Sequence, residues 1–306
     1  FTDLEGRFHM LDYDKKFLLG SSENLTFDVS SVRGFSQQAE SDLAFLSRLL
    51  EDEGIHYVID DADTLVLGDS PSAFDGAPAP LPVRQRTGMD QAEDAVYDLG
   101  YRGHLGAGKV TVRDFDFERP SLDVVGEAEV PLGVPGGPEW YLYPSARTTP
   151  DGARRKAQLL AEAFACSRDR LAGRSFAGWL RPGLTVPLLD VPEGIDPDPV
   201  SIVVVEHDFS RTGGGFFVSF EALSADRTMR PEPVTPVPRA VGPITGFVTG
   251  PPGEDIHTDQ WGRVKVHFPW DRLQPKDDRC SDWIPTLQDN TGRSSAIPRI
   301  GWEMLV

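Results

Sequence analysis

The sequence predicts an α+β protein that is mainly β, with a larger β-barrel-containing domain followed by a small β-barrel. Three observations predict this fold. Short runs of β-branched and aromatic residues dominate, only two segments have the apolar spacing of a helix, and a proline cluster separates residues 239–306 from the rest. The 306 residues, 39% of them hydrophobic, are enough for two domains with cores of their own.

The first predicted helix covers residues 41–54. Ser41 is a good N-cap, leucines recur at helical spacing over Leu43–Leu50, and Gly54 can end the helix in a left-handed conformation. Two β-rich runs follow, at residues 55–59 and 64–67, with aspartates between them. This order indicates a helix followed by a β-hairpin.

The rest of the larger domain is predicted to be sheet with one more helix. Residues 71–100 are rich in Pro and Gly and are expected to be irregular. Asp151 is predicted to cap a helix from Ala153 to Leu171, because apolar residues recur there at helical spacing. Strands are expected at residues 109–117, 176–180, 185–189, 201–207 and 216–222.

Four prolines, at positions 231, 233, 236 and 238, stiffen a segment that we predict to be an extended linker, residues 231–238. Short strands separated by turn residues follow the linker, a pattern typical of a small β-barrel. They are expected at residues 244–249, 263–268, 283–287 and 303–306. The predicted domains are therefore residues 1–230 and 239–306.

Charge and composition exclude several classes of protein. From Arg239 onward eight Lys and Arg stand against nine Asp and Glu, a balance of −1, so residues 1–238 carry −17 of the total −18. Such an acidic surface repels phosphate backbones, which argues against a nucleic-acid-binding protein. The sequence has no uninterrupted apolar run of about 18 residues, so we expect no stable membrane insertion by this segment. The chain begins at Phe1 with charged residues, and we expect this end to be a truncation.

The motifs that could carry chemistry are weak. Residues 103–110 nearly spell a phosphate-binding loop, but Val110 stands where Ser or Thr must hold magnesium, and a strand pattern follows instead of a helix. The aspartates of residues 60–63 lack the glycine and glutamate of a calcium loop. His257 and His267 have no partner motif for zinc. We therefore predict no catalytic, cofactor-binding or metal site and no enzymatic activity.

Residues 255–271 carry a family resemblance. An acidic and histidine-containing stretch leads into Trp261-Gly262-Arg263-Val264-Lys265-Val266, and the segment ends in Trp270-Asp271. This pattern resembles the signature of VgrG-type spike proteins of type VI secretion and other contractile injection systems, in the phage baseplate hub-and-spike family. Residues 297–306 resemble the closing strand of the same barrel. The resemblance implies a structural or interface role for the following residues: Trp261, Gly262, Arg263, Val264, Lys265, Val266, Trp270, Asp271, Trp283, Pro298, Arg299 and Gly301.

The upstream half resembles the same family independently. Residues 40–55 are similar to its hub-domain helix and the following strand, and residues 110–118 to a later strand. The resemblance covers about residues 36–306, with poor matches at 70–100 and 120–150. Residues 283–292 depart from the family pattern, which places the chain on a divergent branch.

The resemblance implies a phage-hub-like domain over residues 1–230, incomplete at its N-terminus, and an OB-fold barrel over residues 239–306 that leads to a β-helical needle beyond this chain. It implies a structural homotrimer without cofactors that caps a hexameric inner-tube protein and carries a membrane-puncturing needle. The expected partners are baseplate components, a tip cone protein and effectors, with assembly in the bacterial cytoplasm and delivery outside the cell or into a target cell.

Two other functions stay open at this point. One is a phage tail baseplate spike whose missing C-terminal part carries a lysozyme-type hydrolase domain. The other is an OB-fold module that binds nucleic acid or sugar, which the near-neutral barrel disfavours because such surfaces combine basic grooves with stacking aromatic residues.

Overall fold

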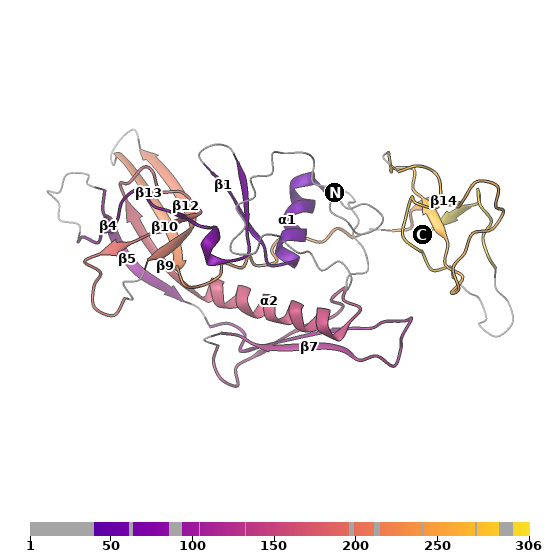
Figure 1. Cartoon of the computed structure of the whole chain (residues 1–306), viewed down its shortest axis with the longest axis horizontal. Helices are drawn as coiled ribbons and strands as arrows, with labels where there is room; N and C mark the ends of the chain where they lie inside the picture. The colour runs from indigo at the N-terminus through magenta and orange to yellow at the C-terminus, as the bar shows by residue number, and fades with distance from the viewer. Residues whose placement is uncertain are drawn as a thin grey trace. The chain divides into compact units, whose positions relative to one another are not determined.

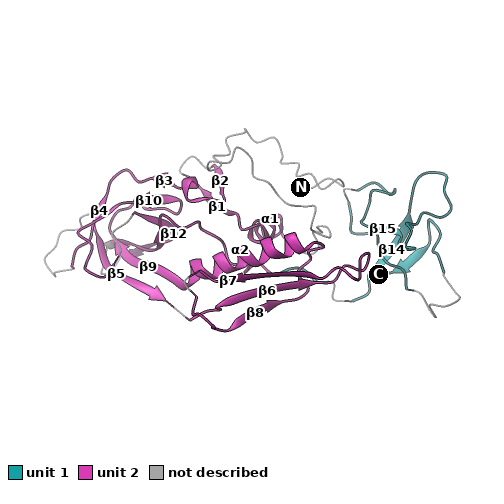
Figure 2. Cartoon of the chain, turned by 60° about the horizontal axis from the view of Figure 1, so that its bottom comes forward, with its two compact units in different colours: residues 1–11, 34–39, 237–306 teal, residues 12–33, 40–236 magenta. Residues whose placement is uncertain are grey.

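The computed structural model describes residues 40–60, 64–85, 94–103, 105–131, 133–195, 199–210, 215–239, 242–272, 274–287 and 296–306. These residues fall into two compact units, and the chain passes from one to the other between Pro236 and Val237 (Figure 2). The described part is mainly β with two α-helices, which confirms the predicted fold class. The assignment of residues 1–230 and 239–306 to a hub domain and an OB-fold barrel stays a prediction.

The larger unit contains a six-stranded sheet with the order β3-β10-β12-β13-β9-β5 (Figure 1). Its centre is the long antiparallel hairpin of β12 and β13, whose alternate side chains, such as Ile202, Val218 and Phe220, are buried in the main core. The strands are β3 (Asp75–Gly76), β10 (Leu184–Val186), β12 (Val200–Ser210), β13 (Gly215–Ser224), β9 (Asp169–Ser175) and β5 (Val96–Gly103).

A second sheet packs against helix α2, Pro150–Arg168 (Figure 1). Its order is β7-β6-β8, with β7 at Val124–Glu129, β6 at Lys109–Asp114 and β8 at Glu139–Leu142. Val110 and Val112 of β6 alternate inward against the alanine-rich face of α2. A side chain at Gly126 of β7 would lie 2.2 Å from the α2 backbone, so glycine is required for this close approach.

Helix α1 and a hairpin form the third part of this unit. The helix (Asp42–Asp52) begins as predicted, because the Ser41 hydroxyl accepts a hydrogen bond from the Ala44 backbone, and Gly54 follows it with φ +69°. The hairpin of β1 and β2 also confirms the prediction. The remaining elements are β1 (His56–Ile59), β2 (Leu65–Gly68), η2 (Pro71–Ala73), β4 (Leu81–Pro82) and β11 (Leu188–Leu189), which pairs with β4.

The C-terminal unit is a small three-stranded sheet of order β15-β14-β16. Val248, Val264 and Val266 form its core, and an isolated bridge joins Val264 to Ile284. Its strands are β14 (Thr245–Thr249), β15 (Lys265–His267) and β16 (Glu303–Leu305). The strand predicted at residues 283–287 is reduced to that single bridge.

Three element predictions in the larger unit were wrong. Helix α2 begins at Pro150 instead of Ala153, because the Thr149 hydroxyl, not Asp151, caps it by accepting a hydrogen bond from Gly152 at 3.1 Å. It ends at Arg168, and the chain continues directly into β9, so the strand predicted at 176–180 lies at 169–175 instead. Residues 71–100, expected to be irregular, contain β3, β4 and the start of β5.

Candidate functional site

The motif at residues 259–263 forms a turn organised by one carboxylate. Asp259 accepts hydrogen bonds from the backbone N–H groups of Trp261 and Arg263, each at 2.9 Å, and forms an ion pair with the Arg263 guanidinium. Burial by itself raises the pKa of Asp259, but these hydrogen bonds outweigh it and lower the pKa below the usual range. Gly262 has φ +73°, and its carbonyl accepts a hydrogen bond from Thr286. The arginine therefore stabilises its own turn.

In the segment that follows the turn, the two valines are buried in the core and Lys265 contacts a neighbouring loop. Val264 and Val266 are fully buried. Lys265 donates a hydrogen bond to the Ser281 carbonyl at 2.6 Å, and its Nζ lies 4.8 Å from the centre of the Trp283 ring. This cation–π contact joins two predicted site residues from different segments and holds the loop before Ile284 against β15.

Two tryptophans of the motif face solvent. Trp261 is 48% exposed, and Trp270 is 45% exposed although it stacks on Phe268 with ring centroids 5.3 Å apart. Asp271 accepts a hydrogen bond from the Gln274 backbone and fixes the turn after Trp270. Neither ring belongs to the apolar core of the C-terminal unit.

The closing segment positions β16. Gly301 has φ +86° and donates a backbone hydrogen bond to the Val248 carbonyl at 2.8 Å. Pro298 is half-buried and Arg299 is exposed, and the Arg299 carbonyl accepts a hydrogen bond from Trp302. The hydrogen bond from Gly301 thus joins this segment to Val248, the core valine of β14.

Sequence reasoning named the proline linker at residues 231–238 but missed the contacts that hold the chain where it leaves the larger unit. Arg230, only 16% exposed, forms an ion pair with Glu162 of α2 at 2.7 Å. The same guanidinium donates to the Gly54 carbonyl at 2.9 Å and the Asp69 carbonyl at 3.2 Å. We call residues 228–235 the exit segment. Arg230 fastens it at once to α2 and to the residues that follow α1 and β2.

Two further contacts hold the exit segment. The imidazole of His56 lies with its Nδ1 3.2 Å from the Met229 carbonyl, which assigns the proton to Nδ1 in the neutral ring. Burial lowers the pKa of His56 to about 4. Thr235 donates from both its backbone N–H and its hydroxyl to the Glu51 carboxylate, at 3.0 and 2.6 Å. The proline segment is therefore anchored on helix α1 and does not start as a free linker.

A buried group of charges joins α1 to α2. Arg147 and Lys156 are 3% and 5% exposed, and both form ion pairs with Asp52; Arg147 also contacts Glu53 at 3.3 Å. Burial tends to raise the pKa of Asp52, but Lys156 and Arg147 lower it below the usual range. For Glu53 burial dominates and raises the pKa. These charges fix the end of α1 against α2 and the segment that precedes it.

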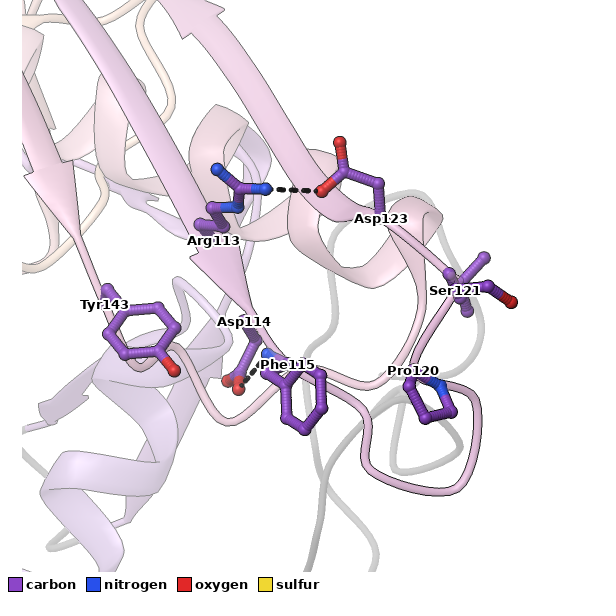
Figure 3. Close-up of a pocket in the computed structure, with 8 residues that line it drawn as sticks. Arg113, Asp114, Phe115, Pro120, Ser121, Asp123 and Tyr143 are labelled. Atoms are coloured by element: carbon purple, nitrogen blue, oxygen red, sulfur yellow. Dashed lines mark hydrogen bonds and ion pairs between the residues drawn. The ribbon is translucent and has the colours of Figure 1, made fainter.

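A shallow pocket of about 300 Å³ opens at the end of β6. Figure 3 shows Phe115 and Tyr143 on either side of the Asp114 carboxylate, with the ion pair of Arg113 and Asp123 at the rim. Asp114 is buried and accepts hydrogen bonds from several backbone N–H groups, including that of Phe115 at 2.7 Å. Its oxygens thus already have donors, and the pocket lining mixes two aromatic rings with polar and charged side chains.

Within the described ranges, no group of three or more His, Cys, Asp or Glu residues is placed to hold a metal ion. The region that nearly spells a phosphate-binding loop leads into strand β6, as its sequence predicted. Among the same residues, neither α-helix combines the length and apolar character needed to cross a membrane.

Comparison with known proteins identifies the fold. The family model described as phage tail baseplate hub (GPD) matches residues 28–213. The chain belongs to this hub family. The matched range includes both α-helices and every strand of the larger unit except β13.

Curated relatives of this hub protein include several spike proteins and a toxin. Spike protein VgrG1b of the Pseudomonas aeruginosa type VI secretion system is 33% identical over 88% of this chain and 39% of its own length. VgrG1a of the same organism is 32% identical over 88% of this chain and 45% of its own length. The actin cross-linking toxin VgrG1 of Vibrio cholerae is 30% identical, covering 88% of this chain and 26% of the toxin. These relatives confirm the resemblance predicted from the motifs, and the chain spans less than half of each.

A solved structure has the same fold. It is an E. coli component of the type VI secretion system, described as structurally similar to the T4 bacteriophage tail proteins gp27 and gp5. The two structures superpose with a TM-score of 0.50 at 20% sequence identity, over 88% of this chain and 57% of the other.

Proposed function

We propose that this chain is the hub portion of a trimeric spike in a contractile injection machine. Its larger unit caps a hexameric inner tube, and its C-terminal unit, an OB-fold barrel, leads toward a needle that carries a tip protein and effectors. The work of such a subunit is mechanical, and we propose that this portion has no enzymatic activity. Assembly would take place in the bacterial cytoplasm, and contraction would deliver the spike out of the cell.

The observation that carries the proposal is the hub-family match over residues 28–213, in a chain whose curated relatives are type VI spike proteins. The site geometry supports it in two ways. Arg263 and Lys265, the charged residues of the motif, are engaged inside their own unit, whereas Trp261 and Trp270 remain exposed for contact with another surface. Arg230 fastens the exit segment, which suits a part that must transmit a push.

Solution mass tests the proposal. Multi-angle light scattering of the 306-residue chain at several dilutions is expected to give a trimer that dissociates only on dilution. A trimer that also co-sediments with a hexameric tube protein supports the hub function. A chain that stays monomeric at every concentration and leaves the tube protein unbound contradicts it.

A further inference from the structure

We propose that strand β8 and the aromatic residues around its end form a subunit interface, and that the occupant is the free edge of β5 in a second copy of this chain. The inference deepens the proposed function and rests on it, because it names the surfaces through which the trimer closes.

Strand β8 is an open sheet edge. In the order β7-β6-β8 it is the last strand, and among the described residues it pairs only with β6. Its Trp140 and Tyr141 are 49% and 56% exposed. Successive side chains of a strand point to opposite faces. Trp140 therefore lies on the face that α2 covers, where its ring centroid is 5.2 Å from that of Phe164, and Tyr141 lies on the opposite face. A strand that adds to this edge would cover the Tyr141 ring and satisfy the unpaired backbone groups together.

The aromatic surface continues beyond the strand. Tyr143 is 56% exposed and faces Phe115, 48% exposed, across the pocket in Figure 3, and Phe117 is 38% exposed. Tyr141, Tyr143 and Phe115, each about half exposed, present about 300 Å² of aromatic surface. This lies within the range of the largest apolar patch of a typical monomer, and the strand edge adds to it toward the roughly 800 Å² that one partner buries in a stable interface.

A cyclic trimer requires two different surfaces on each copy, since a head-to-tail contact joins one patch to another. The second surface must therefore be another sheet edge. Strand β7 offers one, but its Glu127 and Glu129 would lie against Glu139 of β8. Like charges placed opposite each other destabilise a strand pair.

Strand β5 is the complementary edge. It is the last strand of the six-stranded sheet, and an isolated bridge between Val83 and Val96 occupies only its beginning. Its open half carries Tyr101, 57% exposed, and Arg102, whose side chain is 72% exposed although it pairs with Glu221. The Tyr101 ring can pack on the exposed ring of β8, and the Arg102 cation complements the Glu139 carboxylate. The β1–β2 hairpin offers apolar edges but no cation within its strands.

A substitution at the centre of the surface tests the first half of the inference. Tyr141→Asp places a charge beside the β8 edge without touching the core, and Ile59→Asp makes the same change at another exposed sheet edge, where the side chain is 62% exposed. We expect light scattering to show that Tyr141→Asp raises the concentration at which the trimer dissociates by at least about tenfold. The Ile59→Asp chain should behave as the wild type. Circular dichroism and melting temperature establish that both variants fold.

The possible outcomes distinguish a failure of the proposed interface from a failure of the proposed function. If the wild type is a trimer and Tyr141→Asp dissociates at the same concentration, the β8 interface is refuted while the trimeric hub stands. If the wild type never forms a trimer, the proposed function fails and the interface fails with it. If both Asp variants weaken the trimer equally, the surface lacks the specificity that we infer.

Disulfide trapping tests the partner strand. Tyr141→Cys is combined in turn with Leu99→Cys, Tyr101→Cys and Gly103→Cys, which lie two residues apart on β5 and so cover the possible registers. Oxidation by diamide is expected to link copies covalently in at least one combination. Neither Tyr141→Cys alone nor its combination with Ile59→Cys should do so. A trimer that no β5 position cross-links overturns the assignment of β5.

Discussion

Arg230→Ala is the substitution that we expect to disturb this protein most selectively. The guanidinium joins three elements that are far apart in the sequence, through the Glu162 carboxylate and the carbonyls of Gly54 and Asp69. All three contacts disappear together in the alanine variant. The side chain is only 16% exposed, so its aliphatic part also leaves a space beside Gly54, whose missing Cβ would lie 3.1 Å from the Arg230 Cδ.

The size of the effect follows from these contacts. A hydrogen bond to a charged group contributes about 1.5–3 kcal/mol, and contributions that share one side chain are not additive. Glu162 is 28% exposed and can regain water, which reduces the loss. We therefore expect the free energy of unfolding of the larger unit to fall by about 3 kcal/mol, with a melting temperature about 10 °C lower for a domain of this size.

Scanning calorimetry resolves the transition of the larger unit from that of the C-terminal unit. The matched control is Arg84→Ala, which removes an arginine whose ion pair with Asp190 is exposed on both sides, 47% and 64%. An exposed pair contributes little, so the control should change stability by less than about 1 kcal/mol. If the two variants have the same stability, the three contacts of Arg230 do not hold the exit segment and the reasoning is wrong.

Three other changes have distinct signatures. The folded pKa of His56 is depressed to about 4 by burial, so its neutral ring contributes stability above pH 6.5 that is lost as the pH falls toward 4. Urea titrations should show a loss of about 3 kcal/mol over this range that His56→Gln flattens. Gly126→Ala should destabilise the larger unit by about 3 kcal/mol, because its Cβ would strike the α2 backbone, whereas Gly100→Ala meets open space and should be neutral by the same titration. In the C-terminal unit, Val266→Ala should lower the stability by about 2 kcal/mol and Trp261→Ala by less than about 1 kcal/mol in chemical unfolding, because only the valine is fully buried.

The parts of the fold that local sequence determines were predictable. Helix α1 follows its cap at Ser41 and its stop at Gly54, and the β12–β13 hairpin follows from long β-rich runs on either side of glycines. The start of α2 was misplaced because Thr149 and Asp151 are both good caps, and only the hydrogen bond to Gly152 decides between them. Strand β8 was missed because its four residues lie between prolines and glycines and are held by a parallel partner across the sheet.

The candidate site was predictable only where its contacts join residues that are close in the sequence. Sequence reasoning named Arg263 from its motif, and its partner Asp259 lies four residues away. Arg230 carries no such signal. Its carbonyl partners lie 161 and 176 residues away, and backbone carbonyls have no sequence identity that could mark them. Contacts of this kind depend on the tertiary fold and are visible only once it is known.

Two arginines stabilise the two units in a similar way. Arg263 neutralises Asp259 inside its own turn, so this pair of charges stabilises the C-terminal unit, and the exposed Trp261 lies on a turn that is itself fixed. Arg230 acts in the same way over a longer range, since it ties the exit segment to Glu162 of α2 and to the residues that follow α1 and β2. A push applied to the exit segment therefore meets hydrogen bonds and ion pairs that must break together. Because Thr235 is bonded twice to Glu51, this resistance extends into the proline segment itself.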